Sequence, residues 1–259
     1  MIKKLRNITS SKIPAIVAVG LLLVIWQAAS MSGLVPSYML PSPSDVLMVF
    51  VRDSSALAQN LAVTLQEAFY GLFFGILIGF IFAVAMDMCD VLYRAFYPIL
   101  VITQTIPTVA IAPLLVLWFG YEMTPKIILI VLVTFFPITV GLMDGFKSAD
   151  PDAVGLLKSM GAGRIQVFRY LKFPSALPQF FSGLRIAVAY SVVGAVISEW
   201  LGGFSGLGVY MTRVKKAFAF DKMFAVIFLI SAVSLLLMAL VDVLEKRCMP
   251  YRHVQKKEK

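Results

Sequence analysis

Long apolar runs alternate with short polar segments along the whole chain. Six of these runs are long enough, at about 17–25 residues, to cross the hydrocarbon layer of a bilayer as an α-helix. They cover residues 14–30, 61–86, 96–119, 127–143, 183–201 and 223–244. The pattern predicts an all-α polytopic membrane protein with six transmembrane helices in one domain over residues 1–259.

The composition supports a membrane protein and excludes several other classes. Hydrophobic residues make up 60% of the chain and charged residues 14%, with a mean hydropathy of +0.89. A soluble domain has about 25% charged residues. Disordered and nucleic-acid-binding chains need more polar or charged sequences. The formal net charge of +9 is consistent with basic loops beside anionic membrane lipid.

The distribution of Lys and Arg predicts the orientation. With the N-terminus in the cytoplasm, 17 of the 23 basic residues lie on the cytoplasmic side, as the positive-inside rule expects. The chain is then a multi-pass protein of the inner (plasma) membrane, and both of its termini lie in the cytoplasm. The first run also resembles a signal peptide that ends at Ala28-Ala29-Ser30, although Trp26 is bulky for a position so near a cleavage site. The basic residues do not decide between a retained span and a cleaved one.

A ladder of glycines lies in the second run. Gly71, Gly75 and Gly79 fall on one face of the predicted helix, and such small residues allow close helix packing inside a membrane. We expect this face to contact another helix.

The third run contains three prolines, including Pro107 beside Gln104. Proline frees helix carbonyls, which a membrane tolerates only where protein or a water-filled cavity satisfies them. We therefore expect this helix to be broken and to line a translocation pathway through Gln104 and Pro107.

Ionisable residues at membrane depth are few. Glu67 and Glu199 lie in the second and fifth runs, and an acid in a span indicates function by default. Glu199 could line the pathway together with Tyr190, or it could bond to loop amides around residues 202–203. The sequence leaves both roles open.

The sequence has no catalytic motif. It lacks a glycine-rich phosphate loop, a metalloprotease motif and a nucleophile elbow. Cys89, Cys248 and His253 are isolated, which predicts no metal site and no cofactor. We therefore do not expect an enzyme, and we do not expect this chain to hydrolyse ATP.

The polar interval at residues 144–182 carries two amphipathic segments. Asp150 and Pro151 form a helix start, and Gly161 supplies a left-handed stop. A second helix is predicted from Arg164 to Pro174. Exposed apolar stripes on such helices favour docking into another protein, or burial in the lipid headgroup layer. The pattern alone does not separate these alternatives.

At this loop the chain resembles ATP-binding cassette (ABC) importer permeases. Gly161 and Leu171-x-Phe173-Pro174 resemble the glycine and I-x-L-P parts of their E-A-A loop, although Gly155 stands where that loop has glutamate. The segments Leu117-Trp118-Phe119-Gly120, Gly183-Leu184-Arg185 and Gly206-Leu207-Gly208 resemble the nitrate, sulfonate and taurine branch.

The resemblance implies a subunit with three kinds of protein partner. A second permease chain, identical in a homodimer, would complete the pathway, and an extracytoplasmic substrate-binding protein would deliver the substrate. A separate ABC ATPase would contact the cytoplasmic coupling loop, where the positions implied are Asp152, Gly155, Leu157, Gly161, Ala162, Arg164, Phe168, Leu171 and Pro174.

Residues 173–178 and 190–203 most resemble the corresponding segments of permeases for pyrimidine precursors of thiamine, and they resemble those of riboflavin permeases nearly as much. The resemblance therefore implies a heterocyclic vitamin precursor, or else a small anion such as nitrate, sulfonate or taurine. A self-contained secondary transporter is the alternative, but it predicts paired inverted repeats and mid-membrane carboxylates. The broken third run has no evident inverted counterpart.

Overall fold

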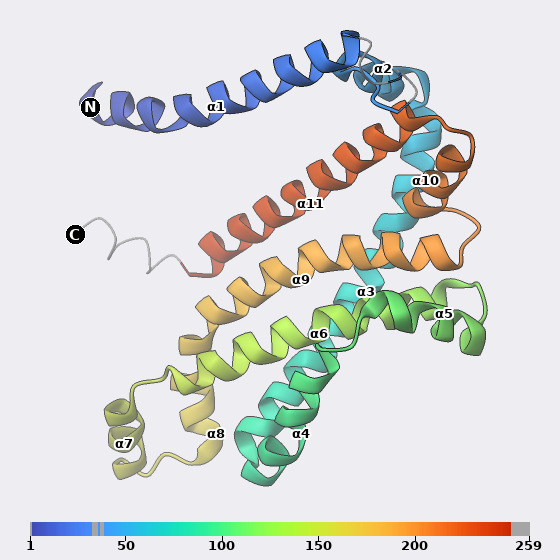
Figure 1. Cartoon of the computed structure of the whole chain (residues 1–259). Coiled ribbons are helices and arrows are strands. Elements are labelled where there is room, and N and C mark those ends of the chain that lie inside the picture. The colour runs from blue at the N-terminus through green and yellow to red at the C-terminus, as the bar shows by residue number, and fades with distance from the viewer. Residues whose placement is uncertain (1, 33–35, 37–38, 250–259) are drawn as a thin grey trace. The chain divides into compact units, whose positions relative to one another are not determined.

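In a computed structural model, which describes residues 2–32, 36 and 39–249, the chain is built of helices, and these residues contain no strand (Figure 1). The all-α prediction is confirmed. The elements are α1 (Ile2–Met31), α2 (Pro43–Arg52), α3 (Ser54–Met88), α4 (Asp90–Thr103), α5 (Thr108–Phe119), α6 (Met123–Lys147), α7 (Pro151–Ser159), α8 (Arg164–Val167), the π-helical η1 (Phe168–Lys172), α9 (Phe173–Leu201), α10 (Leu207–Lys216) and α11 (Phe220–Cys248).

The apolar helices of the structure account for most of the six predicted spans. Among the described residues, four helices are long and apolar enough to cross a membrane, and the bent pair α4 and α5 gives up to five. The first predicted run lies within α1, of which the part Val17–Met31 is a further, shorter apolar helix.

The third predicted span is two helices that bend by 98°. Pro98 and Pro113 lie inside α4 and α5, whereas Pro107 has extended backbone angles and precedes α5. Proline disfavours helical geometry in the residue before it, and the chain turns at this one proline. The prediction that the third run is broken is confirmed, but the break lies at one of its three prolines and not at each of them.

The second predicted loop helix does not end at Pro174. A continuous helix runs from Arg164 to Leu201, and Pro174 lies in the first turn of α9. The N–H of Phe173 bonds to the carbonyl of Phe168, five residues back. This π-helical turn changes the hydrogen-bond register just before the proline, so the helix continues where a regular α-helix would lose a bond. The fifth span therefore begins well before residue 183.

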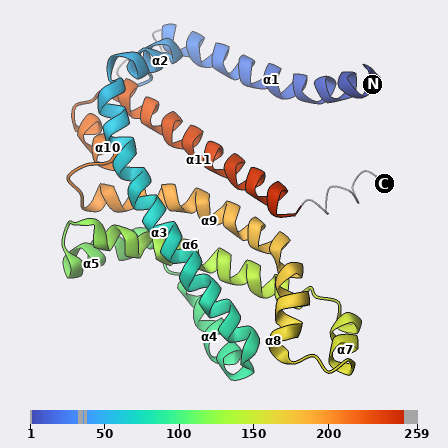
Figure 2. The same cartoon turned by 180° about the vertical axis from the view of Figure 1, so that it is seen from behind.

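The described residues form two compact units, of which the larger comprises residues 60–209 and 230–249. Within it, α6 and α9 run side by side (Figures 1 and 2). Glycine allows their close approach. A Cβ on Gly141 would lie only 2.8 Å from the Gln179 carbonyl oxygen, and one on Gly183 would overlap the Pro137 carbonyl. The buried side chains of Ile138, Leu142, Phe146 and Ala187 contribute to the core here.

The glycine ladder of α3 lies against α6. A Cβ on Gly71 would overlap Ile130, one on Gly75 would overlap Thr134, and one on Gly79 would lie 2.9 Å from the Phe135 carbonyl oxygen. The absence of side chains at these positions allows the close approach of α3 to α6.

The smaller unit comprises residues 1–59 and 210–229. Trp26 of α1 stacks on Phe228, with ring centroids 5.8 Å apart, and its Nε1 donates to the Pro41 carbonyl at 3.1 Å. Asp53, at the end of α2, accepts a hydrogen bond from the Tyr210 hydroxyl at 2.9 Å and pairs with Lys222 at 2.5 Å.

We expect the smaller unit to lose stability in acid through Asp53. The hydrogen bond and charge of Lys222 lower the pKa of this carboxyl, against an opposing effect of burial. The contribution is therefore complete above the unfolded-state pKa of about 4 and is lost as the pH falls through the lower folded-state pKa. Proteolysis of the full chain in micelles between pH 6 and pH 2, compared with Asp53→Asn, measures it. Identical acid sensitivity of the two proteins would contradict this assignment.

Candidate functional site

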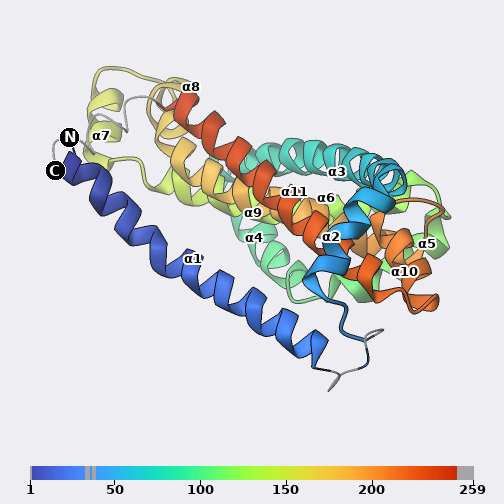
Figure 3. The same ribbon diagram turned by 90° about the horizontal axis from the view of Figure 1, so that it is seen from above.

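The loop between α6 and α9 presents a group of exposed apolar side chains. Leu156 lies in α7 and Met160 is the C-cap residue of that helix, and 64% and 75% of their surfaces are exposed. Ile165 of α8 and Tyr170 of η1 are similarly exposed. These four residues are called the coupling surface below. Figure 3 shows α7 and α8 at the end of the α6 and α9 pair that lies away from α5.

The local sequence determines the shape of α7. The Asp150 carboxylate accepts from the Asp152 N–H at 2.9 Å, Pro151 occupies the first helical turn, and Gly161 has a positive φ of 85°. The predicted helix start and left-handed stop are confirmed. Gly161 thereby reverses the chain into α8.

The second half of the loop is attached firmly to the membrane helices. Lys172 of η1 donates to both carboxylate oxygens of Asp87 in α3, at 2.7 and 3.0 Å. The Phe168 ring contacts Phe146 of α6, with centroids 5.1 Å apart. Side-chain contacts therefore join η1 and its start to α3 and α6.

The structure places the predicted loop residues in two groups. Asp152, Gly155, Gly161, Arg164 and Pro174 are exposed, whereas Leu157, Ala162, Phe168 and Leu171 are half-buried. The sequence analysis did not identify Leu156, because it placed the apolar face of this helix at Leu157.

A cavity of about 400 Å³ opens along the α6 and α9 pair. Its lining from α6 includes Phe136, Pro137 and Asp144, and its lining from α9 includes Gln179, Ser182, Ile186 and Tyr190, while Gln104 approaches from the link between α4 and α5. Asp144, Ser182, Tyr190 and Gln104 are exposed. Exposed polar side chains on spanning helices face water or another protein rather than lipid.

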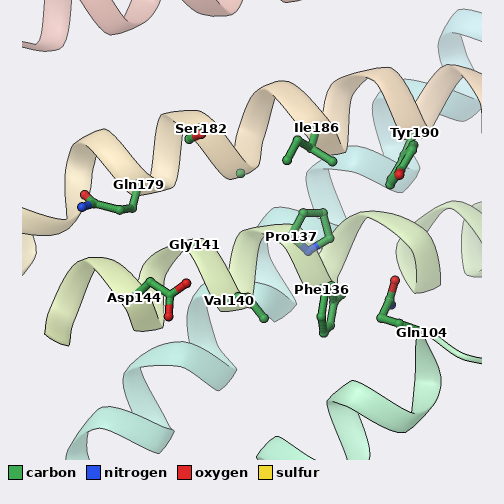
Figure 4. A pocket seen from close by; sticks show the side chains of 11 residues that line it. Gln104, Phe136, Pro137, Val140, Gly141, Asp144, Gln179, Ser182, Ile186 and Tyr190 are labelled. Atoms are coloured by element: carbon green, nitrogen blue, oxygen red, sulfur yellow. The ribbon is translucent and has the colours of Figure 1, made fainter. Parts of the chain in front are cut away.

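The polar groups of the cavity are divided between its two ends (Figure 4). Asp144 and Gln179 lie at one end, Gln104 and Tyr190 lie at the other, and Pro137, Phe136 and Ile186 lie between them. Of the four residues predicted to line the pathway, Gln104 and Tyr190 line this cavity. Pro107 and Glu199 do not.

Glu199 belongs instead to a buried polar cluster formed by Asn60, Thr64, Glu67, Lys126 and Glu199. Thr64 donates to Glu199 Oε1 at 2.7 Å, and Lys126 Nζ lies 2.5 Å from Glu67 Oε1. Glu67 and Glu199 interact electrostatically, and both are at most 2% exposed. Lys126 thus pairs with Glu67, whereas Glu199 is held by Thr64.

The same cluster holds the link between α9 and α10. Glu199 Oε2 accepts from the Gly208 N–H at 2.6 Å, Thr64 Oγ1 accepts from the Leu207 N–H at 2.9 Å, and Asn60 Oδ1 accepts from the Gly206 N–H at 3.0 Å. Amides at a helix N-terminus favour such acceptors. Glu199 thus bonds to loop amides, the second of its two predicted roles, although the amide is that of Gly208.

The sequence analysis did not identify Asn60, Thr64 or Lys126 as members of this cluster. The sequence does contain a signal for Asn60 and Thr64. Asn60, Thr64 and Glu67 are spaced by four and three residues, which places them on one face of an otherwise apolar helix. Lys126 lies close to the predicted outer loop and carried no such signal. Within the described residues, no three His, Cys, Asp or Glu side chains gather as a metal site requires, and His253 lies outside those residues.

The sequence and fold were compared with known proteins. Residues 75–249 match the model of a family described as the inner membrane component of binding-protein-dependent transport systems. A formylaminopyrimidine transport permease protein, ThiX of Halalkalibacterium halodurans, is 41% identical over 91% of this chain and 94% of its own. A riboflavin transport system permease protein, RibX of Chloroflexus aurantiacus, is 32% identical over 94% of this chain and 92% of its own.

Solved structures share the fold. A chain of an amino acid ABC transporter superposes with a TM-score of 0.65 and 16% identity, over 77% of this chain and 97% of that one. At this identity the likeness concerns the fold alone.

Proposed function

Because this chain belongs to the family of inner membrane components of binding-protein-dependent transport systems, we propose that it forms a translocation pathway with a second copy of itself and couples it to a separate ABC ATPase through the coupling surface. The chain is a multi-pass permease subunit of an ABC importer and not an enzyme. Its contacts with partner proteins, its pathway and its substrate are what we propose beyond the family.

The observation that carries the proposal is the exposure of the coupling surface on a firmly attached loop. Leu156, Met160, Ile165 and Tyr170 are between 64% and 75% exposed, and burial of such side chains in a protein groove is favourable. The Lys172 ion pair with Asp87 connects the same loop to α3. ATP-driven movement of a docked ATPase would therefore move the membrane helices.

We place the pathway at the cavity along α6 and α9, with Gln104 and Tyr190 in its wall. Both termini are proposed to be cytoplasmic, as the basic residues predict. An extracytoplasmic binding protein would then deliver the substrate to the opposite side. The glycine ladder, Gly71, Gly75 and Gly79, keeps α3 packed on α6 beside this pathway.

The proposed substrate is a small heterocyclic vitamin precursor of the hydroxymethylpyrimidine type. The support is the relative named for formylaminopyrimidine transport, which is more similar to this chain than the relative named for riboflavin transport. Riboflavin or a small anion such as nitrate, sulfonate or taurine are the other candidates.

Replacing Leu156 by glutamate tests the ATPase contact. A buried leucine contributes about 1.5–3 kcal/mol, and a charge in its place adds a desolvation penalty, so we expect affinity for the co-expressed ABC ATPase to fall about tenfold or more. Co-purification with the tagged full chain from gently solubilised membranes measures the change.

Lys158→Gln is the matched control, since Lys158 is on the same helix but lies outside the coupling surface. It should retain the ATPase. Undiminished ATPase recovery with Leu156→Glu would count against this docking surface.

A further inference from the structure

One end of the cavity along α6 and α9 carries hydrogen-bonding groups but no positive charge. Asp144, Gln179 and Ser182 supply a carboxylate, a carboxamide and a hydroxyl, and the lining residues include no Lys, Arg or His. We call these three residues the acceptor end. The other polar pair, Gln104 and Tyr190, lies too far along the helices for a small ring to contact both ends, since residues 179 and 190 are separated by roughly 16 Å of helix at 1.5 Å per residue.

The cations nearest in sequence to the acceptor end have other partners. Lys147, one turn beyond Asp144, donates to the Tyr93 hydroxyl at 2.8 Å and lies 4.4 Å from the centroid of that ring. Arg185, one turn beyond Ser182, pairs with Asp242 at 2.5 Å and with Glu245. Neither side chain supplies a counter-ion to the cavity.

Gln179 provides a second indication of a ligand. Its Oε1 atom is buried, and no described group bonds to it. A buried acceptor without a partner costs about 1–3 kcal/mol. Rotation of the carboxamide would turn this oxygen into the cavity, where a bound N–H donor would remove the cost.

We propose that the acceptor end is a binding subsite for a flat heterocycle bearing an exocyclic amino group, such as a 4-aminopyrimidine. The inference rests on the proposed function and specifies the chemistry of its substrate. A carboxylate accepts a hydrogen bond from the amino group of a 4-aminopyrimidine base, and a carboxamide bonds in a bidentate manner to an amino group and the adjacent ring nitrogen. Asp144 and Gln179 offer these two groups, and the apolar side chains of Ile186 and Phe136 continue the wall beside them.

The same groups disfavour the anionic candidates. Nitrate or a sulfonate at this end would face the Asp144 carboxylate without a compensating cation in the lining. Like charges at close range repel strongly where water is partly excluded. The subsite therefore selects an amino heterocycle over a small anion.

A cysteine reporter at Val140, which lines the cavity but is not one of the three acceptor residues, tests the subsite directly. The full chain carrying Val140→Cys, Cys89→Ser and Cys248→Ser is placed in nanodiscs with its ATPase, and alkylation by a water-soluble maleimide is timed. The probe is 4-amino-5-hydroxymethyl-2-methylpyrimidine. At ten times its Kd it should slow alkylation about tenfold, because only the unoccupied fraction reacts.

Three comparisons decide the outcome. The analogue without the 4-amino group and sodium nitrate should give no protection, and Asp144→Ala should abolish protection by the probe without changing the unprotected rate. Asp90→Ala, which removes an exposed acid of α4, should leave protection intact. Protection by nitrate, or equal protection by the analogue, overturns the proposal.

Two further results would also overturn it. If the probe fails to protect, no aminopyrimidine subsite exists here, and the ATPase recovery measured with Leu156→Glu still stands as a separate test of the proposed function. If the thiol introduced by Val140→Cys cannot be alkylated at all, another protein surface covers the cavity wall, and a disulfide between two copies of this variant would identify that surface as the second permease chain.

Discussion

Replacing Lys126 by methionine is expected to destabilise the helical bundle by about 3–5 kcal/mol, because removal of one partner leaves an uncompensated buried charge. Lys126 is 5% exposed, and its ammonium group lies 2.5 Å from Glu67 Oε1. Glu67 interacts in turn with Glu199, which holds the Gly208 amide. Thermal unfolding of the full chain in detergent micelles measures the loss.

The charge explanation can be separated from a simple packing defect. In the double variant Lys126→Met and Glu67→Met, both members of the ion pair become apolar, and most of the lost stability should return, since buried ion pairs are often replaceable by apolar side chains. Lys215→Met removes an exposed lysine and should change stability by less than about 0.5 kcal/mol. A double variant no more stable than Lys126→Met would show that the ammonium group does not act through Glu67.

Replacing Gly161 by valine is expected to abolish ATP-driven uptake while the chain still inserts in the membrane. Gly161 has a φ of 85°, and a non-glycine residue in this conformation costs about 1–3 kcal/mol, with β-branched residues the least tolerant. The turn between α7 and α8 would open, and Leu156 and Ile165 would no longer form one surface. Uptake of the radiolabelled aminopyrimidine, with the ATPase and binding protein present, measures the effect.

Two glycine variants are matched controls for this turn. Gly161→Asn should retain most uptake, since asparagine tolerates the left-handed region better than valine. Gly155→Ala adds a methyl group with no atom within 4 Å in α7 and should strengthen that helix by about 0.5–1 kcal/mol. Wild-type uptake by Gly161→Val would mean that the turn does not transmit the ATPase movement.

The loop shows how far local sequence extends and where it stops. Asp150, Pro151 and Gly161 defined α7 correctly because caps and left-handed stops depend on neighbouring residues alone. Pro174 misled the prediction, because the π-helical turn of η1 and the packing of Phe168 on Phe146 carry the helix past it. Local propensity cannot include that compensation.

In the membrane helices, the buried polar cluster also could be identified only in part from the sequence. The sequence marked Glu67 and Glu199 as unusual because an acid in an apolar span is costly wherever the helix lies. Their partners come from α3, α6 and the start of α10, up to 135 residues apart in the chain. No periodicity within one helix contains this information.

The sequence by itself determined that the chain is a helical membrane protein with amphipathic loop helices and a permease-like pattern, because hydrophobic runs, caps and turn glycines act over one or two helical turns. The tertiary structure alone decided that the chain bends at Pro107, that Glu199 holds the α10 amides, and that Asp144 and Gln179 share one end of a cavity. These features arise where α6, α9 and their neighbours meet, and helix packing, rather than local sequence, sets which side chains come together.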